Sequence, residues 1–370
     1  MKTIVVSAVN IRKGGTLTIL RSCLAYLSSL SPSEYRVVAL VHNRILADYP
    51  HIQYIEFPNT IKGWGKRLWC EYITMHKVSK QLQPIDLCLS LHDTTPWVEA
   101  RVQAVYCQTS FPFLKWRMRD LRFDYKIVLF ALLTRFAYRV NIHRNRFLIV
   151  QAQWLRNGFS KMFGLDYSKF VVFPPRVDRR DFSDRYLHAK RQGYTFFFAA
   201  TPDAHKNFDI VCMAAEQLER KVGTKRFKVV LTISGKDNKY SSYLYDTYHH
   251  VGSIDFVGFL PKDKLNTLYE QADCLIFPSR IETWGLPISE FANYRKPMLL
   301  ADLPYAHESA EGCERVAFFQ VNDVADLMGK MTMLLDGNEN FLSEVPDNPI
   351  AEPSVSSWQE LFQMLLQASE

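Results

Sequence analysis

Two carboxylates, Glu282 and Glu290, stand eight residues apart at a predicted strand–loop–helix junction. The largely apolar run 273–277 predicts a buried parallel strand, because strands that are covered on both faces read as nearly continuous apolar runs. Pro278 ends that strand, since proline cannot donate to a ladder, and Pro287 suits the first turn of a helix. We therefore expect Glu282 in a loop at the strand's carboxyl end and Glu290 about one turn into the next helix.

This junction has the composition of a binding site for a phosphorylated ligand that also carries hydroxyl groups. Open α/β sheets bind ligands at the carboxyl ends of their strands, and the free N–H groups of a helix start favour an anion such as a diphosphate. A nucleotide sugar has phosphate at one end and hydroxyls at the other. An ordinary junction with a solvated Glu282 and a salt-bridged Glu290 would show the same pattern.

Three further positions follow predicted strands. Lys206 comes after the strand 194–200, where its ammonium group could neutralise a diphosphate leaving group. Gly14 and Gly15 follow the first strand, and a Gly-Gly turn lets backbone amides approach a phosphate, although a tight strand–helix turn would also explain it. His92 stands at the end of the strand 86–91, yet a lone histidine is more often structural. The fingerprint Gly-x-Gly-x-x-Gly is absent, so the sequence does not indicate a dehydrogenase.

The segment 282–290 resembles the E-x7-E signature of the family 4 retaining glycosyltransferases, which have the GT-B fold. That family usually reads Glu-Gly-Phe-Gly-Leu where this chain has Glu-Thr-Trp-Gly-Leu at 282–286. Pro297 and the segment 301–304 also resemble bacterial O-antigen and capsule enzymes of the family. The resemblance covers the whole chain loosely and is specific mainly over 273–308.

The resemblance implies roles for the candidate residues. Glu282 would hold sugar hydroxyls, Glu290 the ribose and Lys206 the diphosphate. His92 matches a family histidine near the reacting carbon of the sugar. Related enzymes often carry His or Asn near Gln108, so Gln108 is an equal candidate for the group near that carbon. Gln108 would then also contact the acceptor. The other implied donor contacts come from Gly14, Gly15, Gly258, Trp284, Gly285 and Leu286. Members usually add an arginine before the lysine, and 198–203 holds none.

Length and composition fit two cytoplasmic domains. The chain has 370 residues and is 48% apolar, so that each domain can bury a core. Its seven cysteines are scattered without a Cys-x-x-Cys pair, which indicates reduced thiols and neither disulfides nor a zinc site. No apolar run approaches the length of a bilayer span, and 1–6 enters a strand without a signal-peptide pattern.

The alternation of strands and helices predicts an α/β, GT-B architecture: two Rossmann-like domains with parallel sheets that face an interdomain cleft. We place the acceptor-binding N-terminal domain at 1–178, a linker at 179–192 and the nucleotide-sugar-binding C-terminal domain at 193–350. A last helix within 351–370 is expected to cross back to the N-terminal domain.

The charge of the chain is concentrated in one stretch. Residues 113–146 hold nine Lys/Arg and two Asp, a net charge of +7 that equals the charge of the whole chain. Aromatic side chains and the apolar run 127–133 accompany these cations, a composition that suits the headgroup region of an anionic membrane. A helix with a solvated basic face would have the same composition. Nucleic-acid binding would also fit these cations, but no nucleic-acid-binding motif is present. Membrane contact would fit an acceptor carried on a polyprenyl diphosphate and a peripheral place on the inner face of the plasma membrane.

The resulting expectation is a retaining hexosyltransferase of O-antigen, capsule or lipopolysaccharide synthesis that uses a GDP-, UDP- or dTDP-linked sugar. No aspartate has another two positions later, so we expect no metal ion and no cofactor besides the donor. A nucleotide-sugar epimerase of the same fold and a non-catalytic glycan- or membrane-binding subunit remain alternatives.

Overall fold

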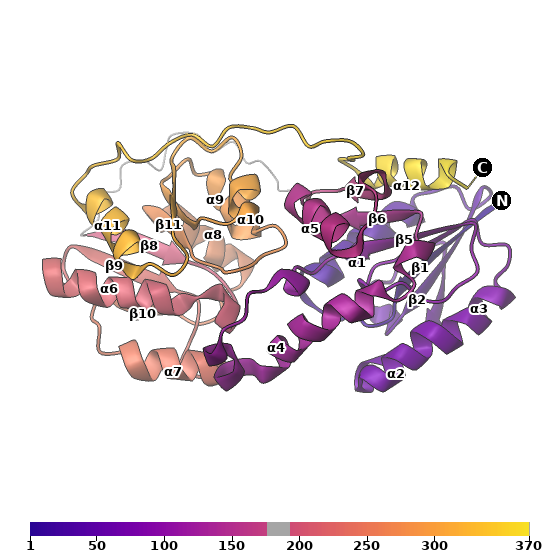
Figure 1. Cartoon of the computed structure of the whole chain (residues 1–370), viewed down its shortest axis with the longest axis horizontal. Coiled ribbons are helices and arrows are strands. Elements are labelled where there is room, and N and C mark those ends of the chain that lie inside the picture. Colours follow the sequence, from indigo (N-terminus) through magenta and orange to yellow (C-terminus); the bar gives the residue numbers. More distant parts are fainter. Residues whose placement is uncertain (176–192, 370) are drawn as a thin grey trace. The chain divides into compact units, whose positions relative to one another are not determined.

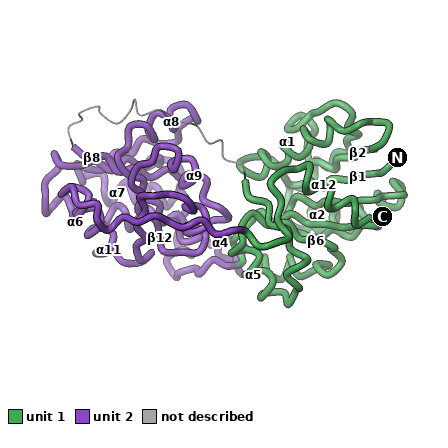
Figure 2. Tube along the Cα trace, turned by 90° about the horizontal axis from the view of Figure 1, so that it is seen from above, with its two compact units in different colours: residues 1–112, 133–175, 350–370 green, residues 113–132, 176–349 purple. Residues whose placement is uncertain are grey.

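The computed structural model describes residues 1–175 and 193–369, which form two compact units (Figure 2). Unit 1 comprises Met1–Pro112, Leu133–Pro175 and Ile350–Glu370, and unit 2 comprises Phe113–Leu132 and Arg176–Pro349. The N-terminus and the last helix of the chain, 358–367, which are seen in Figure 1, both belong to unit 1. The predicted linker 179–192 lies outside the described residues.

Unit 1 is built on a parallel sheet of seven strands in the order β3-β2-β1-β4-β5-β6-β7. Apart from the edge strand β3, its strands are largely buried on both faces, as expected for a parallel sheet. The strand order reverses between β1 and β4, so the loops after these two strands diverge to opposite sides of the sheet. The strands are β1 Lys2–Ala8, β2 Tyr35–Val41, β3 Ile52–Glu56, β4 Leu87–Ser90, β5 Val102–Cys107, β6 Phe147–Val150 and β7 Phe170–Val172.

The C-terminal helix of the chain is part of unit 1. Leu361, Phe362 and Leu365 of α12 are buried in the same core as Leu24 of α1, and the Phe362 ring stacks on Tyr26 at 5.6 Å. Two helices of this unit are joined by a π-helical turn, η3. The helices are α1 Gly14–Ser28, α2 Trp64–Trp69, η3 Cys70–Thr74, α3 Met75–Gln81, α5 Gln153–Phe163 and α12 Trp358–Gln367.

Unit 2 is built on a parallel sheet of six strands in the order β10-β9-β8-β11-β12-β13, which reverses between β8 and β11. The strands are β8 Tyr194–Phe198, β9 Phe227–Leu231, β10 Ile254–Phe256, β11 Cys274–Phe277, β12 Met298–Ala301 and β13 Val316–Phe319. The helices are α6 Phe208–Val222, α7 Lys239–Tyr248, α8 Lys262–Gln271, α9 Leu286–Ala292, α10 Pro304–Ser309 and α11 Val324–Leu335. The predicted α/β class with two parallel sheets is thus confirmed.

Helix α4 (Met118–Arg139) belongs to both units. Its backbone leaves the helical conformation at Asp124, with φ −151° and ψ 80°, and residues up to Leu132 lie in unit 2. The sequence-based division assigns this stretch to the first domain, and the units of the structure differ there. The reason is a set of long-range contacts, among them the ion pairs of Arg119 with Asp209 and of Asp120 with Arg280.

Candidate functional site

The structure joins two of the predicted site residues directly. Lys206 ends a short 3-10 turn, Ala204–Lys206, after β8, and Glu282 lies in the loop after β11. The Lys206 Nζ and Glu282 Oε1 atoms are 2.6 Å apart, and the two side chains remain 16% and 14% exposed. Because β8 and β11 are the strands between which the order reverses, the pair occupies the place where open α/β sheets bind ligands.

The loop that carries Glu282 is held in one conformation by glycine and by hydrogen bonds. Gly285 has φ 98°, a value that favours glycine, and an added Cβ would lie 3.3 Å from Ser309 Oγ. Trp284 donates from Nε1 to Ser289 Oγ at 2.9 Å, and its carbonyl accepts from the Ser309 hydroxyl. Leu286 is the exposed first residue of α9. The predicted strand, proline stop, loop and helix are therefore present.

Glu290 has a different cationic partner. One of its carboxylate oxygens pairs with Lys262 Nζ, and the other accepts from the Tyr269 hydroxyl at 3.1 Å. Lys262 opens α8 four residues after Gly258, which has φ 73°. Phe259, between them, is 85% exposed. Sequence reasoning missed Lys262 and Phe259, although their place directly after Gly258 was a signal for them.

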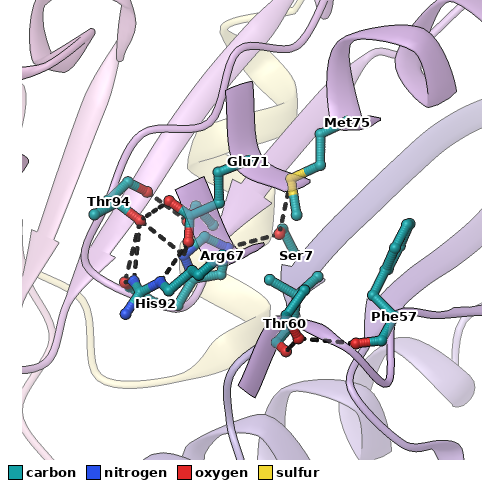
Figure 3. Close-up of polar contacts among 10 residues, drawn as sticks. Ser7, Phe57, Thr60, Arg67, Glu71, Met75, His92 and Thr94 are labelled. Atoms are coloured by element: carbon teal, nitrogen blue, oxygen red, sulfur yellow. Dashed lines mark hydrogen bonds and ion pairs between the residues drawn. The ribbon is translucent and has the colours of Figure 1, made fainter. Parts of the chain in front are cut away.

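In unit 1, His92 is the centre of a buried polar network (Figure 3). Its Nε2 lies 2.7 Å from Ser7 Oγ, and its Nδ1 lies 3.0 Å from Thr94 Oγ1. The Thr94 hydroxyl donates to Glu71 at 2.6 Å, so its oxygen is left to accept from Nδ1–H of His92. His92 is therefore a neutral imidazole that accepts from Ser7 at Nε2, and burial lowers its pKa to about 4.

The carboxylate of this network sits in the π-helical turn η3. Burial would raise the pKa of Glu71, but the Arg67 guanidinium and the hydrogen bonds from Arg67 and Thr94 hold it below its ordinary value. Arg67 Nε lies 2.6 Å from Glu71 Oε1, and Nη2 donates to the His92 carbonyl at 2.9 Å. Single π-helical turns inside helices are frequent at functional sites. No sequence pattern pointed to Ser7, Arg67, Glu71 or Thr94.

These contacts describe the surroundings of the two candidates for the group beside the reacting sugar carbon. The His92 side chain has no exposed surface, and both of its ring nitrogens are occupied, so in this conformation the ring does not face a ligand. Gln108 is also buried, and its Nε2 donates to the Leu91 carbonyl at 2.5 Å. Asp93, which follows His92 and accepts from the Gln108 backbone N–H, has φ 68°, and burial raises its pKa to about 6. The strand ends bring His92 and Gln108 into one region, but neither side chain points outward.

The glycine pair is exposed at the start of α1. Gly14 has φ 70°, and a Cβ on either Gly14 or Gly15 would meet no heavy atom within 4 Å. The pair follows β1, which is one of the two strands at the reversal in the sheet of unit 1. The exposed cations Arg12 and Lys13 precede it.

Helix α4 carries the basic and apolar stretch. Tyr125, Leu129, Leu133 and Phe136 recur at helical spacing and are each more than half exposed. Exposed cations accompany them at Arg122, Lys126, Arg135 and Arg139. The helix covers 118–139 of the basic stretch 113–146. Over the described residues, no helix combines the length and the apolar character needed to cross a bilayer.

Comparisons with known proteins agree with this description. Residues 179–345 match the family model of glycosyl transferases group 1. The chain is 23% identical over 177 residues to the O-antigen chain mannosyltransferase RfbU of Salmonella typhimurium strain LT2. That match covers 47% of each protein, so the chain spans about half the length of this relative.

Solved structures resemble the chain over nearly its whole length. The lipopolysaccharide outer core galactosyltransferase WaaB has a TM-score of 0.61 and 10% identity, with 92% of this chain and 91% of WaaB covered. Anabaena Alr3699/HepE, solved with UDP and glucose, has a TM-score of 0.63 and 13% identity, with 100% and 96% covered. At such identities the likeness shows the fold, which is GT-B. The chain thus has the GT-B fold and is similar over residues 179–345 to the family model of glycosyl transferases group 1.

Proposed function

We propose that the protein is a retaining, metal-independent glycosyltransferase. It would move a hexose-type sugar from a nucleoside diphosphate to a glycan or lipid-linked saccharide of a bacterial surface polysaccharide. The observation that carries this proposal is the Lys206–Glu282 pair at the reversal of the sheet in unit 2. The match to the group 1 family model and the similarity to an O-antigen mannosyltransferase support it.

The pair supplies what sugar transfer requires. The departing diphosphate builds up negative charge, and a fixed cation beside it lowers the barrier. Lys206 is such a cation, and Glu282 holds it in place at 2.6 Å. When the donor binds, the lysine can turn to the diphosphate while Glu282 accepts hydrogen bonds from sugar hydroxyls. Both side chains are partly exposed, so that a ligand can reach them.

The second cluster of unit 2 fits the nucleoside. Glu290 can accept from ribose hydroxyls in place of Lys262, whose ammonium group is then released toward a phosphate. The exposed Phe259 ring, after the left-handed Gly258, offers a flat apolar surface for a base. Lys206 and Lys262 are the cations that would replace a metal ion at the diphosphate.

The acceptor side is proposed for unit 1 and α4. The exposed apolar row at Tyr125, Leu129, Leu133 and Phe136 has cations beside it, which suits an anionic lipid surface. A saccharide on a polyprenyl diphosphate would be presented at that surface. We place the protein on the inner face of the plasma membrane for this reason.

A binding subunit without turnover is the second candidate. It is favoured by the burial of His92, which leaves the group expected beside the sugar carbon without exposed surface. The missing arginine in 198–203 points the same way. Such a subunit would bind nucleotide and glycan, but would release no nucleoside diphosphate from a donor.

A two-stage experiment separates these functions. A thermal-shift screen with UDP, GDP, dTDP and CMP identifies the base, and the matching sugar donors are then incubated with lipid-linked acceptor. Release of nucleoside diphosphate and a product whose anomeric configuration, read by proton NMR, equals that of the donor would support the proposal. Binding without turnover would select the subunit, conversion of the donor sugar without acceptor would select an epimerase, and absence of any nucleotide binding would overturn all three.

A further inference from the structure

Arg280 stands two residues before Glu282, and its side chain is only 6% exposed. Its two terminal nitrogens donate to the two oxygens of Asp120, at 2.9 and 2.6 Å. This is a bidentate pair between residues 160 positions apart, and Asp120 is itself 9% exposed. A buried fork of this kind fixes the orientation of both side chains.

The same arginine also holds the turn that carries Lys206. Arg280 Nη2 donates to the Ala204 carbonyl at 3.2 Å, and the Arg280 backbone N–H donates to the His205 carbonyl at 2.8 Å. One side chain therefore connects the loop of Glu282, the turn of Lys206 and Asp120.

A second ion pair holds the segment that follows Lys206 in the sequence. Arg119, next to Asp120, pairs with Asp209, which lies in the first turn of α6. The second oxygen of Asp209 accepts from the Tyr240 hydroxyl at 2.7 Å. The Phe123 ring packs against Tyr240 at 5.2 Å. Residues 113–123, which we call the strap, thus contact Asp209 of α6, Tyr240 of α7 and Arg280 of the loop after β11, all within unit 2.

Arg280 does not have the surroundings of a phosphate ligand. Its charge is balanced by Asp120, and almost none of its surface is open to solvent. Loss of either partner would leave a buried charge without compensation, and the remaining group would move toward water. For Arg280, such a movement would release the Ala204 carbonyl and loosen the turn before Lys206.

We propose that Asp120 is a positioning residue for the donor site and that it acts through Arg280 on the turn of Lys206. The inference rests on the proposed function, because it assumes that Lys206 and Glu282 hold the donor. It adds a residue that lies far away in sequence and has no contact with Lys206 or Glu282 of its own in the described hydrogen bonds.

The test compares D120N, R280M and the double variant with the wild type by titration with the nucleotide sugar. D120N keeps the shape of the side chain and removes its charge. Each single variant is expected to weaken donor binding about tenfold, and the double variant no further, because residues that act through one contact are not additive. D336N is the matched control, since it breaks the exposed Arg226–Asp336 pair of the same unit.

Two further readouts separate positioning from a general loss of structure. A smaller folded fraction would lower kcat alone, whereas a displaced Lys206 raises the donor KM and leaves the acceptor KM unchanged. Hydrogen exchange of the wild type needs no variant: nucleotide binding should slow exchange in 115–121 as well as in 203–207, because coupling between sites is reciprocal.

The outcomes distinguish this inference from the proposed function. If the wild type binds no nucleotide, the proposed function fails and the inference with it. If the wild type binds nucleotide, but D120N and R280M bind it equally well, only the inference is overturned. Should both variants fail to fold, unchanged exchange in 115–121 on nucleotide binding would overturn it.

Discussion

The ammonium nitrogen of Lys206 lies 2.6 Å from a carboxylate oxygen of Glu282, although 76 positions separate the two residues in the sequence. They meet because β8 and β11 are neighbours at the reversal of the sheet and both loops leave from its carboxyl edge. Glu290 has its own lysine, Lys262. The two carboxylates of the signature therefore belong to two clusters, which we assign to the sugar and to the nucleoside.

This division predicts different effects for the two glutamates. E282Q should weaken binding of the nucleotide sugar about ten- to hundredfold, the cost of a lost charged hydrogen bond, and leave binding of the nucleoside diphosphate nearly unchanged. E290Q should weaken both ligands, because both contain ribose. Titration calorimetry with the two ligands measures this. Equal losses for E282Q with both ligands would refute the assignment of Glu282 to the sugar.

The burial of His92 predicts that the free energy of unfolding depends on pH. Its folded pKa of about 4 lies below the ordinary value of 6.5, so between these values the unfolded chain binds a proton that the folded chain does not. The His92 contribution to stability is therefore complete above pH 6.5 and is lost as the pH falls toward 4. H92Q cannot be protonated, so the free energy of unfolding of the wild type should fall relative to H92Q by about 3 kcal/mol over this range.

Denaturant unfolding of wild type and H92Q at several pH values gives this difference. The subtraction removes the titration of Asp93, whose raised pKa of about 6 acts in the opposite direction. A difference that stays constant from pH 7 to pH 4 would show that His92 is accessible to protons and not sequestered with Glu71.

The buried hydrogen bonds of Arg156 predict that replacing this residue destabilises unit 1. It is fully buried, and its guanidinium donates to the carbonyls of Ala351 at 2.7 Å and Pro353 at 2.5 Å. R156M leaves these acceptors without that donor, so the free energy of unfolding should fall by about 2–4 kcal/mol. The matched control is R226M, at an exposed arginine, which should change it by less than about 0.5 kcal/mol. Equal denaturation curves for R156M and wild type would contradict this account of the C-terminal segment.

The exposed apolar and cationic side chains of α4 predict that the protein binds to anionic vesicles. Replacement of Leu129, Leu133 and Phe136 by serine removes three exposed apolar side chains, and the vesicle partition coefficient should fall at least about tenfold. I45S is the control, because Ile45 is 86% exposed outside the basic stretch. Flotation with vesicles that contain anionic lipid measures the effect, and high salt should weaken it. Binding that is equal for neutral vesicles, or unchanged in the triple variant, would rule out this surface.

Much of the donor region could be predicted from the sequence because its signals are local. Pro278, Gly285 and Pro287 mark a strand end, a left-handed turn and a helix start, and each acts on its own backbone. The ion-pair partners of the glutamates in this region could not be predicted. That Lys262 pairs with Glu290 depends on how α8 packs against the rest of unit 2, which no local pattern encodes.

The same limit applies to His92 in unit 1 and to α4. The end of the strand before His92 could be predicted, but the burial of His92 depends on Glu71 of the π-helical turn η3 and on Arg67 of α2. The membership of 113–132 in unit 2 depends on the pair of Asp120 with Arg280, far away in the sequence. Long-range ion pairs leave no periodicity that a sequence pattern can show.

The proposed use of lysines predicts that turnover does not require a divalent ion. No aspartate of the chain has another two positions later, and Lys206 and Lys262 lie beside the two glutamates of the site. Activity after treatment with a chelator should equal that of untreated protein. Loss of activity that Mg²⁺ or Mn²⁺ restores would contradict the proposal.

The most direct test of the central claim is a titration of wild type and K206M with the nucleoside diphosphate found in the thermal-shift screen. Lys206 is proposed to bind the diphosphate, so K206M should bind at least about tenfold more weakly, while the D336N control binds as the wild type does. Equal affinity of K206M and wild type would show that the Lys206–Glu282 pair is not the donor site.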